Sequence, residues 1–176
     1  MEVAMLFASL PGKDGEALSA RAKKYCRKTA RFLKDDPHRC VLFASDALGF
    51  RQSELYSKLI TQELRNLGVQ MGQIVVLSSI AESTLGEIEL AEAYYVEHTP
   101  RDITMYAISS WQHLPRILFL WKLHYGGRIV KPVWVWDFYF ETLFLLALEP
   151  FKFFLSILPS SIQGWFNIIL FKLIYK

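Results

Sequence analysis

Short apolar runs alternate along this chain with longer segments in which apolar residues recur at helical spacing. Runs that are continuously apolar, rather than alternately apolar and polar, are typical of parallel strands covered on both faces. The predicted strands cover residues 3–9, 40–45, 74–79, 103–110 and 129–136, and the predicted helices cover residues 16–34, 52–67, 85–98 and 115–125. The alternation predicts an α/β fold with an open, five-stranded parallel sheet in three layers, of the Rossmann-like kind.

A second region, residues 138–176, follows the alternating domain of residues 1–137 and is dominated by Phe, Leu and Ile. Charged residues and a proline interrupt its first half, and a segment with proline and glycine separates the second, so neither half spans a bilayer comfortably. Two short helices are predicted, over residues 151–158 and 165–175, packed on the domain or lying in a membrane interface. In the second case the headgroup-facing residues would be Lys152, Trp165 and Lys172.

Serine ends four of the predicted strands, at Ser9, Ser45, Ser79 and Ser110. The carboxyl ends of parallel strands form one rim of the sheet, and ligands bind there, near the point where the strand order reverses. Serine before a helix is also a common N-cap, which needs no ligand. The N-cap interpretation is favoured for any one serine. The set as a whole favours a binding rim, with Ser45 among the candidate ligand-binding residues.

The segment 109–116, with sequence SSWQHLPR, carries the strongest candidate chemistry. It runs from a strand end into a helix whose first turn holds Pro115, where a missing N–H has no cost. Helix N-termini attract anions, and Arg116 in the same turn can form a bidentate pair of hydrogen bonds with a phosphate or carboxylate. Ser109 is then a candidate ligand-binding residue and His113 a candidate catalytic acid or base. The alternative is an exposed loop histidine beside a solvated arginine.

A second candidate cluster follows the third predicted strand. Thr84 and Glu87 have the spacing of a capping box, with Thr84 as the cap. Their expected place at the same rim also makes Thr84 a candidate for ligand binding and Glu87 for catalysis. A third and weaker cluster comprises Ser45 and Asp46 with Arg51 and Glu54, where polar loop residues are expected in any case.

The charge of the chain adds a cationic surface to this picture. The net charge is +3, and the helix expected over residues 16–34 places Arg21, Lys24, Lys28 and Arg31 on one face. Such a face is most often simply solvated, and an anionic membrane surface is the alternative partner. Nucleic acid is not expected, because no aromatic residues interleave these basic residues in a recognised motif.

Cysteine content and the N-terminal pattern bear on location. Two cysteines and the lack of a CxxC motif predict neither a disulfide framework nor a metal site. The first residues form a strand-like run, with neither a basic segment nor a long apolar segment before it. This pattern predicts no signal peptide. The expected location is the cytoplasm, with peripheral attachment to the inner face of the cytoplasmic membrane if the apolar region is interfacial.

Over residues 3–136 the chain resembles the bacterial domain-of-unknown-function family typified by SanA, ElyC and YdcF. The resemblance rests on the βα alternation, on T-x-x-E at Thr84 to Glu87, and on S-x-W-x-H-x-P-R at Ser109 to Arg116. It implies a Rossmann-like fold with a rim pocket and a link to cell-envelope biogenesis, without an established reaction. It also implies that the pocket residues are Thr84, Glu87, Ser109, His113 and Arg116.

Departures from the family leave two functions open. Family members usually have glycines after the first two strands, whereas this chain has Ser9-Leu10-Pro11 and Ser45-Asp46-Ala47. One hypothesis is a protein that binds an anionic, phosphate-bearing small molecule at the rim, as a hydrolase or transferase acting on a phosphorylated or lipid-linked substrate. The other is a non-catalytic, membrane-associated interaction protein that has lost the glycine loops. The sequence specifies no cofactor, metal or oligomeric state.

Overall fold

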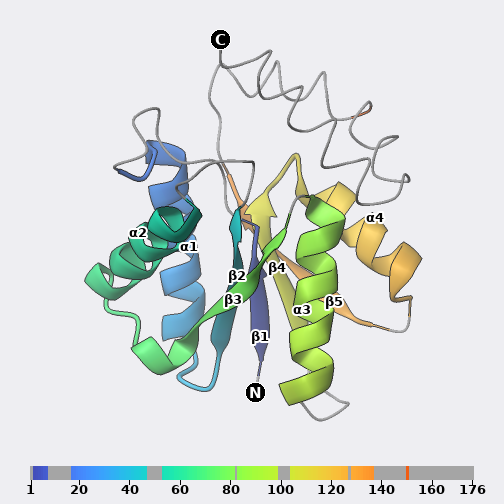
Figure 1. Ribbon diagram of the computed structural model, residues 1–176, viewed down its shortest axis with the longest axis horizontal. Coiled ribbons are helices and arrows are strands. Elements are labelled where there is room, and N and C mark those ends of the chain that lie inside the picture. The colour runs from blue at the N-terminus through green and yellow to red at the C-terminus, as the bar shows by residue number, and fades with distance from the viewer. Residues whose placement is uncertain are drawn as a thin grey trace.

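The computed structural model describes residues 2–7, 17–46, 53–81, 83–98, 104–126, 128–136 and 150. These residues form a five-stranded parallel sheet with the strand order β3-β2-β1-β4-β5 (Figure 1). The strands are β1 (Val3–Leu6), β2 (Cys40–Asp46), β3 (Ile74–Ala81), β4 (Met105–Ser110) and β5 (Val130–Val135). The helices are α1 (Ala20–Lys34), α2 (Ser53–Asn66), α3 (Thr84–His98) and α4 (Leu114–His124), with a short 3-10 helix η1 (Met71–Gln73) before β3. The predicted α/β class and the parallel sheet are confirmed, and the order is Rossmann-like.

Helices cover both faces of the sheet, which gives the predicted three layers. The helices α1 and α2 pack on one face, and α3 and α4 pack on the other (Figure 1). Alternate residues of β1 enter the two cores: Ala4 and Leu6 lie with α1 and α2, whereas Val3 and Met5 lie with α3 and α4. A strand buried on both faces has no solvated side, so its sequence is continuously apolar.

The helix α1 begins later than the sequence pattern suggests. Its first residue is Ala20, and the hydroxyl of Ser19 accepts a hydrogen bond from the Ala22 backbone N–H at 3.1 Å. The predicted start near residue 16 is therefore wrong, because a serine cap satisfies the orphan N–H groups of the first turn at that point. The side of α1 away from its basic face is buried in the core. It consists of Ala22, Tyr25, Cys26, Thr29, Ala30, Phe32 and Leu33.

The third strand is longer than predicted and contains an irregularity. Ala44 of β2 pairs with Leu77, but the next residue, Ser45, pairs with Ile80. Residues 78 and 79 are therefore extra on β3, in the manner of a bulge, and pairing resumes through Ala81. The prediction that this strand ends at Ser79 is wrong. Two apolar residues after the serines continue the ladder.

The strand β5 forms an edge of the sheet in the described part of the chain. The carbonyl of Val135 accepts a hydrogen bond from the Trp111 backbone N–H at 3.3 Å, so Val135 points its backbone groups toward the β4 side. Since these directions alternate along a strand, Pro132 and Trp134 point theirs outward. Pro132 has no N–H to donate. It can occupy this position because its backbone faces away from β4, so the ladder between β4 and β5 loses no hydrogen bond there.

Several predictions fall outside the described residues. Ser9, the headgroup-facing residues Lys152, Trp165 and Lys172, and the division at residues 138–176 are among them. Among the described helices, none is both long and apolar enough to cross a membrane.

Candidate functional site

The rim of the sheet brings the starts of α3 and α4 together. The order of strands reverses between β1 and β4, since β2 and β3 lie on one side of β1 and β4 and β5 on the other. The helices α3 and α4 follow β3 and β4 and contact each other on one face of the sheet. Open parallel sheets bind their ligands at this kind of switch point. The segments predicted to carry chemistry are therefore placed at one edge of the fold.

Three of the predicted site residues contact one another. Arg116 Nη2 lies 2.7 Å from His113 Nδ1 and 3.3 Å from Thr84 Oγ1. His113 Nε2 lies 3.4 Å from the same threonine oxygen. The same Arg116 nitrogen lies 3.4 Å from His113 Nε2, so the guanidinium contacts both ring nitrogens. The cluster, called the rim cluster below, joins a cation, a titratable ring and a hydroxyl.

Ser83, rather than Thr84, caps α3. The Ser83 hydroxyl accepts a hydrogen bond from the Gly86 backbone N–H at 3.1 Å, and its carbonyl accepts one from the Glu87 N–H at 3.0 Å. The predicted capping box of Thr84 and Glu87 is therefore wrong. The reason is that the helix starts one residue earlier than that box requires. Thr84 is consequently the first residue of the helix, and its hydroxyl contacts Arg116 and His113 instead.

The other predicted rim residues occupy different surroundings. Ser109 is buried, and its hydroxyl donates to the Phe7 carbonyl at 3.5 Å, which links β4 to β1. Glu87 is half-buried, three residues after Thr84 on α3, and thus lies on the same side of that helix. Ser45 lies in β2 at the register shift, and its side chain is outside the described part of the structure.

The loop between β4 and α4 connects the rim to α1, a connection that sequence reasoning missed. Gln112 is 8% exposed, and its side-chain oxygen accepts a hydrogen bond from Arg21 Nη2 of α1 at 3.4 Å. Its amide nitrogen is buried without a hydrogen-bond partner among the residues described. Beside it, the Trp111 ring stacks on that of Trp136, with centroids 6.2 Å apart. The contacts of Gln112 with Arg21 and of Trp111 with Trp136 depend on the strand order, which the sequence does not reveal.

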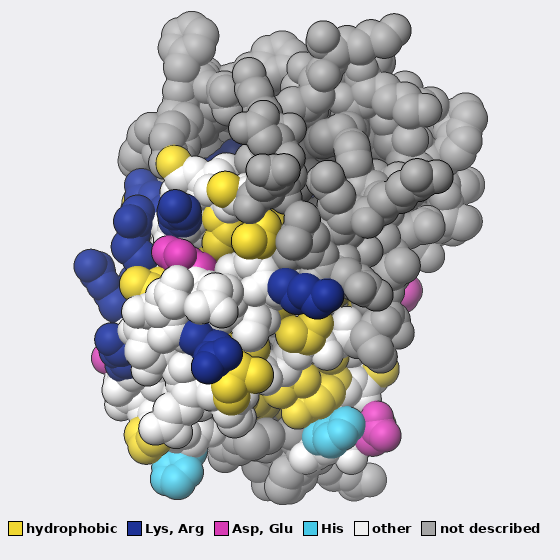
Figure 2. Space-filling model, turned by 60° about the vertical axis from the view of Figure 1, so that its left-hand side comes forward, with side chains coloured by type: hydrophobic (Ala, Val, Ile, Leu, Met, Phe, Trp, Pro, Cys, Tyr) yellow, Lys and Arg dark blue, Asp and Glu magenta, His cyan; other side chains and the backbone are white. Residues whose placement is uncertain are grey.

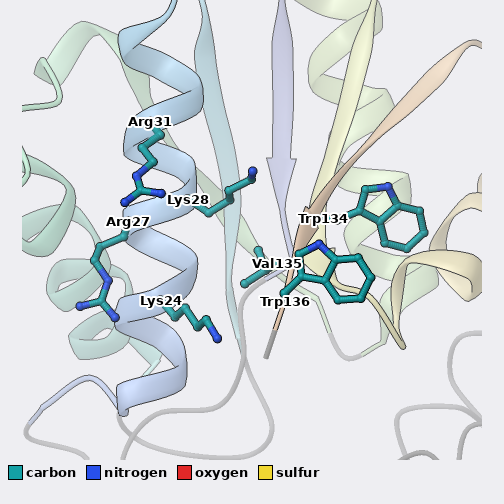
Figure 3. Close-up of a pocket in the computed structure, with 7 residues that line it drawn as sticks. All are labelled: Lys24, Arg27, Lys28, Arg31, Trp134, Val135 and Trp136. Carbon is teal, nitrogen blue, oxygen red and sulfur yellow. The ribbon is translucent and has the colours of Figure 1, made fainter. Parts of the chain in front are cut away.

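A hollow of about 300 Å³ lies between α1 and the end of β5. Its lining residues are Lys24, Arg27, Lys28, Arg31, Trp134, Val135 and Trp136, and they define what is called the α1–β5 hollow here. Lys and Arg side chains gather on this side of the molecule (Figure 2), and Lys24 and Lys28 extend from α1 toward β5 in the close-up (Figure 3). The sequence predicted the cationic face but not its position beside the end of β5.

Two charged clusters toward the amino ends of the strands were also missed. The buried Glu92 accepts hydrogen bonds from Arg128 Nη2 at 2.9 Å and from the Trp121 indole N–H at 2.5 Å, and the guanidinium lies over the Tyr95 ring. In the second cluster, Glu2 accepts from Arg39 Nε at 2.6 Å and from the Tyr106 hydroxyl at 2.8 Å.

The second cluster shifts the titration of its members. The hydrogen bond from Tyr106 and the nearby Arg39 guanidinium lower the pKa of Glu2, and burial together with that same bond raises the pKa of Tyr106. The sequence gives no specific signal for either cluster, because Glu92 is one of four glutamates in α3 and Glu2 precedes the first strand.

Cysteine and metal chemistry receive no support from the described residues. Burial raises the pKa of the Cys26 thiol to about 12 and also raises that of Cys40, so neither thiol is activated as a nucleophile. Within the described ranges, no group of three or more His, Cys, Asp or Glu residues is placed to hold a metal ion.

Comparison of the chain with protein-family models, with curated proteins and with solved structures finds no match. Function must therefore be inferred from the rim cluster itself.

Proposed function

We propose that this protein binds a phosphate-bearing small molecule at the carboxyl rim of its sheet, through Arg116. The observation that carries the proposal is the convergence of Thr84, His113 and Arg116, from two different helix starts, at distances of 2.7–3.4 Å. Arg116 lies in the first turn of α4, an eleven-residue helix whose dipole favours an anion at this end. The contacts to Thr84 and His113 orient the guanidinium before a ligand arrives, which lowers the entropic cost of binding.

The chemistry we propose at this site is transfer of a phosphoryl group, or of a group linked to phosphate, to water or to another acceptor. Arg116 offsets the negative charge that develops on the phosphate oxygens. His113, as an imidazolium stabilised by the bound phosphate, donates a proton to the leaving-group oxygen, becomes a neutral imidazole, and later recovers a proton from solvent. Thr84 holds the ring in this orientation. We further propose that the substrate belongs to cell-envelope metabolism, as the resemblance to the SanA, ElyC and YdcF family implies.

The proposal is tested by the melting temperature of the full-length protein with a panel of sugar phosphates, prenyl phosphates, nucleotides and S-adenosylmethionine. A ligand at about 100 times its Kd stabilises the folded state by about 2.7 kcal/mol, or roughly 5–10 °C for a chain of this size. We expect Arg116→Ala to abolish the increase and Arg116→Lys to retain only part of it, because lysine lacks the bidentate fork.

The matched control is Arg65→Ala, which removes the same charge from the exposed end of α2 and should keep the full increase. His113→Ala should keep most of the binding while lowering phosphoester turnover by about 100-fold or more, as expected for loss of an acid. An increase that persists in Arg116→Ala, or the lack of any increase with the whole panel, would contradict the proposal.

A further inference from the structure

The edge of the sheet formed by β3 is open in the described part of the chain. The strand β3 pairs with β2 on one side, and no described strand lies on its other side. Figure 1 views the sheet from this edge, with β3 in front of the other strands. The eight residues of β3 include no charge, proline or glycine, whereas the opposite edge strand, β5, contains Lys131 and Pro132. An open edge without such residues is a site where a further strand can pair.

The backbone of Val76 faces the open side of β3. The Cys40 N–H donates to the Glu2 carbonyl, so Cys40 faces β1, and the next residue of β2, Val41, faces β3. In a parallel ladder, a residue that faces the neighbouring strand bonds to the two residues on either side of its partner. The partner of Val41 is Ile74, so residues 73 and 75 bond to β2. Ile74 and, two residues later, Val76 therefore face away from β2.

Val76 presents both of its backbone groups on this edge. The Ile74 N–H also faces away from β2, but it donates to the Met71 carbonyl at the end of η1. The outward-facing groups in this half of the strand are therefore the Ile74 carbonyl and the N–H and carbonyl of Val76. Beyond Leu77 the irregularity at residues 78 and 79 changes the spacing, so regular pairing on the open side is confined to residues 74–77.

The side chain of Val76 is also uncovered. It lies on the same face of the sheet as Ile74, which belongs to the core under α1 and α2. The helix α2 packs on β2 on that face, and Val76 remains 44% exposed, although valine is among the residue types most often buried. A partner at this edge must therefore supply main-chain donors and acceptors together with an apolar side chain, as an extended strand does.

From the open edge, the backbone directions and the exposed valine together, we propose that β3 pairs with β3 of a second copy of this chain. The two strands run antiparallel about a two-fold axis at Val76. Directly opposed residues in an antiparallel pair can exchange both of their N–H···O=C bonds, which suits a residue that presents both groups.

A second copy fits this edge better than an unrelated strand does. The two-fold axis lets Val76 form both bonds with its own equivalent and covers both valine side chains, and the uncharged strands bring no like charges together. The two sheets then form one continuous sheet. This interface lies on β3 and does not depend on the function proposed for the rim cluster.

The test is sedimentation equilibrium of the 176-residue chain over a range of concentrations. We expect the average mass to rise from 20.4 kDa towards twice that value as the concentration increases. Val76→Lys should weaken dimerisation by about tenfold or more, because like charges directly opposite each other in a strand pair are destabilising. The matched control is Val96→Lys, at a valine of α3 that is 74% exposed, and it should dimerise like the parent.

The two-fold axis is tested by mixing variants. Val76→Glu alone should dimerise as weakly as Val76→Lys, but an equimolar mixture of the two should recover dimers, because opposite charges then face each other. Val76→Thr keeps a branched, uncharged side chain and the main-chain bonds, so it should retain most of the dimerisation. Circular dichroism of each variant checks that it folds, as expected for substitutions at a partly exposed edge position.

Three results would overturn the proposal. The parent chain could stay at 20.4 kDa at every concentration. Val76→Lys could fold and dimerise as strongly as the parent, which would assign the contact to another surface. The mixture of Val76→Lys and Val76→Glu could stay monomeric although each variant folds, which would exclude a pair centred on Val76. Arg116→Ala, by contrast, should leave dimerisation unchanged, so failure of the rim proposal and failure of this one are distinguishable.

Discussion

The amino end of the sheet and the α1–β5 hollow both gather cations, but the described lining of the hollow includes no carboxylate, whereas the amino end includes two. Arg39 lies 4.4 Å from the centroid of the Phe32 ring and donates to Glu2, and Arg128 lies 3.5 Å from that of Tyr95 and donates to Glu92. The ion pairs of Arg39 and Arg128 therefore stabilise the fold.

The strongest test of this comparison is Glu92→Ala, which leaves Arg128 and the Trp121 N–H without their shared acceptor. Removing one partner of a buried ion pair costs about 3 kcal/mol or more, which corresponds to a fall in melting temperature of roughly 6–12 °C for a chain of this size. Thermal unfolding followed by circular dichroism measures it. Glu97→Ala, on the same helix but with a side chain 77% exposed, should change stability by less than about 0.5 kcal/mol. Equal effects of the two substitutions would show that the Glu92 pair is not structural.

A smaller effect is expected from Glu2→Gln, and it should depend on pH. The pKa of Glu2 is lowered in the folded state, so its charge contributes stability above the unfolded-state pKa, and that contribution is lost as pH falls through the lower, folded-state pKa. For this partly exposed pair the contribution is about 1 kcal/mol or less. Urea unfolding at neutral pH should therefore show the variant to be less stable, with the difference closing in acid. A difference that stays constant down to acid pH would exclude the ion pair as its cause.

The smallest expected effect has the opposite sign. Lys28→Gln removes one of the mutually repelling charges of the hollow while keeping a good helix former, and should raise the stability of the unliganded protein by about 0.3 kcal/mol. Replicate urea unfolding at low salt would measure the change, which added salt should diminish. A clear loss of stability would mean that Lys28 is held by a structural partner, like Arg39 and Arg128.

The secondary structure could largely be predicted, because burial of each strand on two faces leaves a direct mark on the sequence. Strand β1 is a continuous apolar run, and the buried side of α1 follows helical spacing residue by residue. The errors lay where one hydrogen bond decides a boundary. Ser19 starts α1 and Ser83 starts α3, but nothing distinguishes either from nearby residues that could also cap a helix.

The rim cluster could be predicted in part, because the carboxyl ends of parallel strands must share an edge. Thr84, His113 and Arg116 were expected there and contact one another, although the function of the cluster remains a proposal. The hollow could not be anticipated. Its cations and Trp136 are about 100 residues apart in the chain, and they meet only because β5 follows β4 on the side of β1 that α1 also reaches.

The proline in β5 has a consequence for how copies of this protein meet. Pro132 has no N–H, and its backbone faces away from β4, toward the open side of the strand in the described part of the chain. A strand from a neighbouring molecule that tried to extend the sheet there would find one donor absent in the middle of the edge, and Lys131 close by. The sheet thus carries a built-in obstacle to edge-to-edge aggregation on the side where it ends.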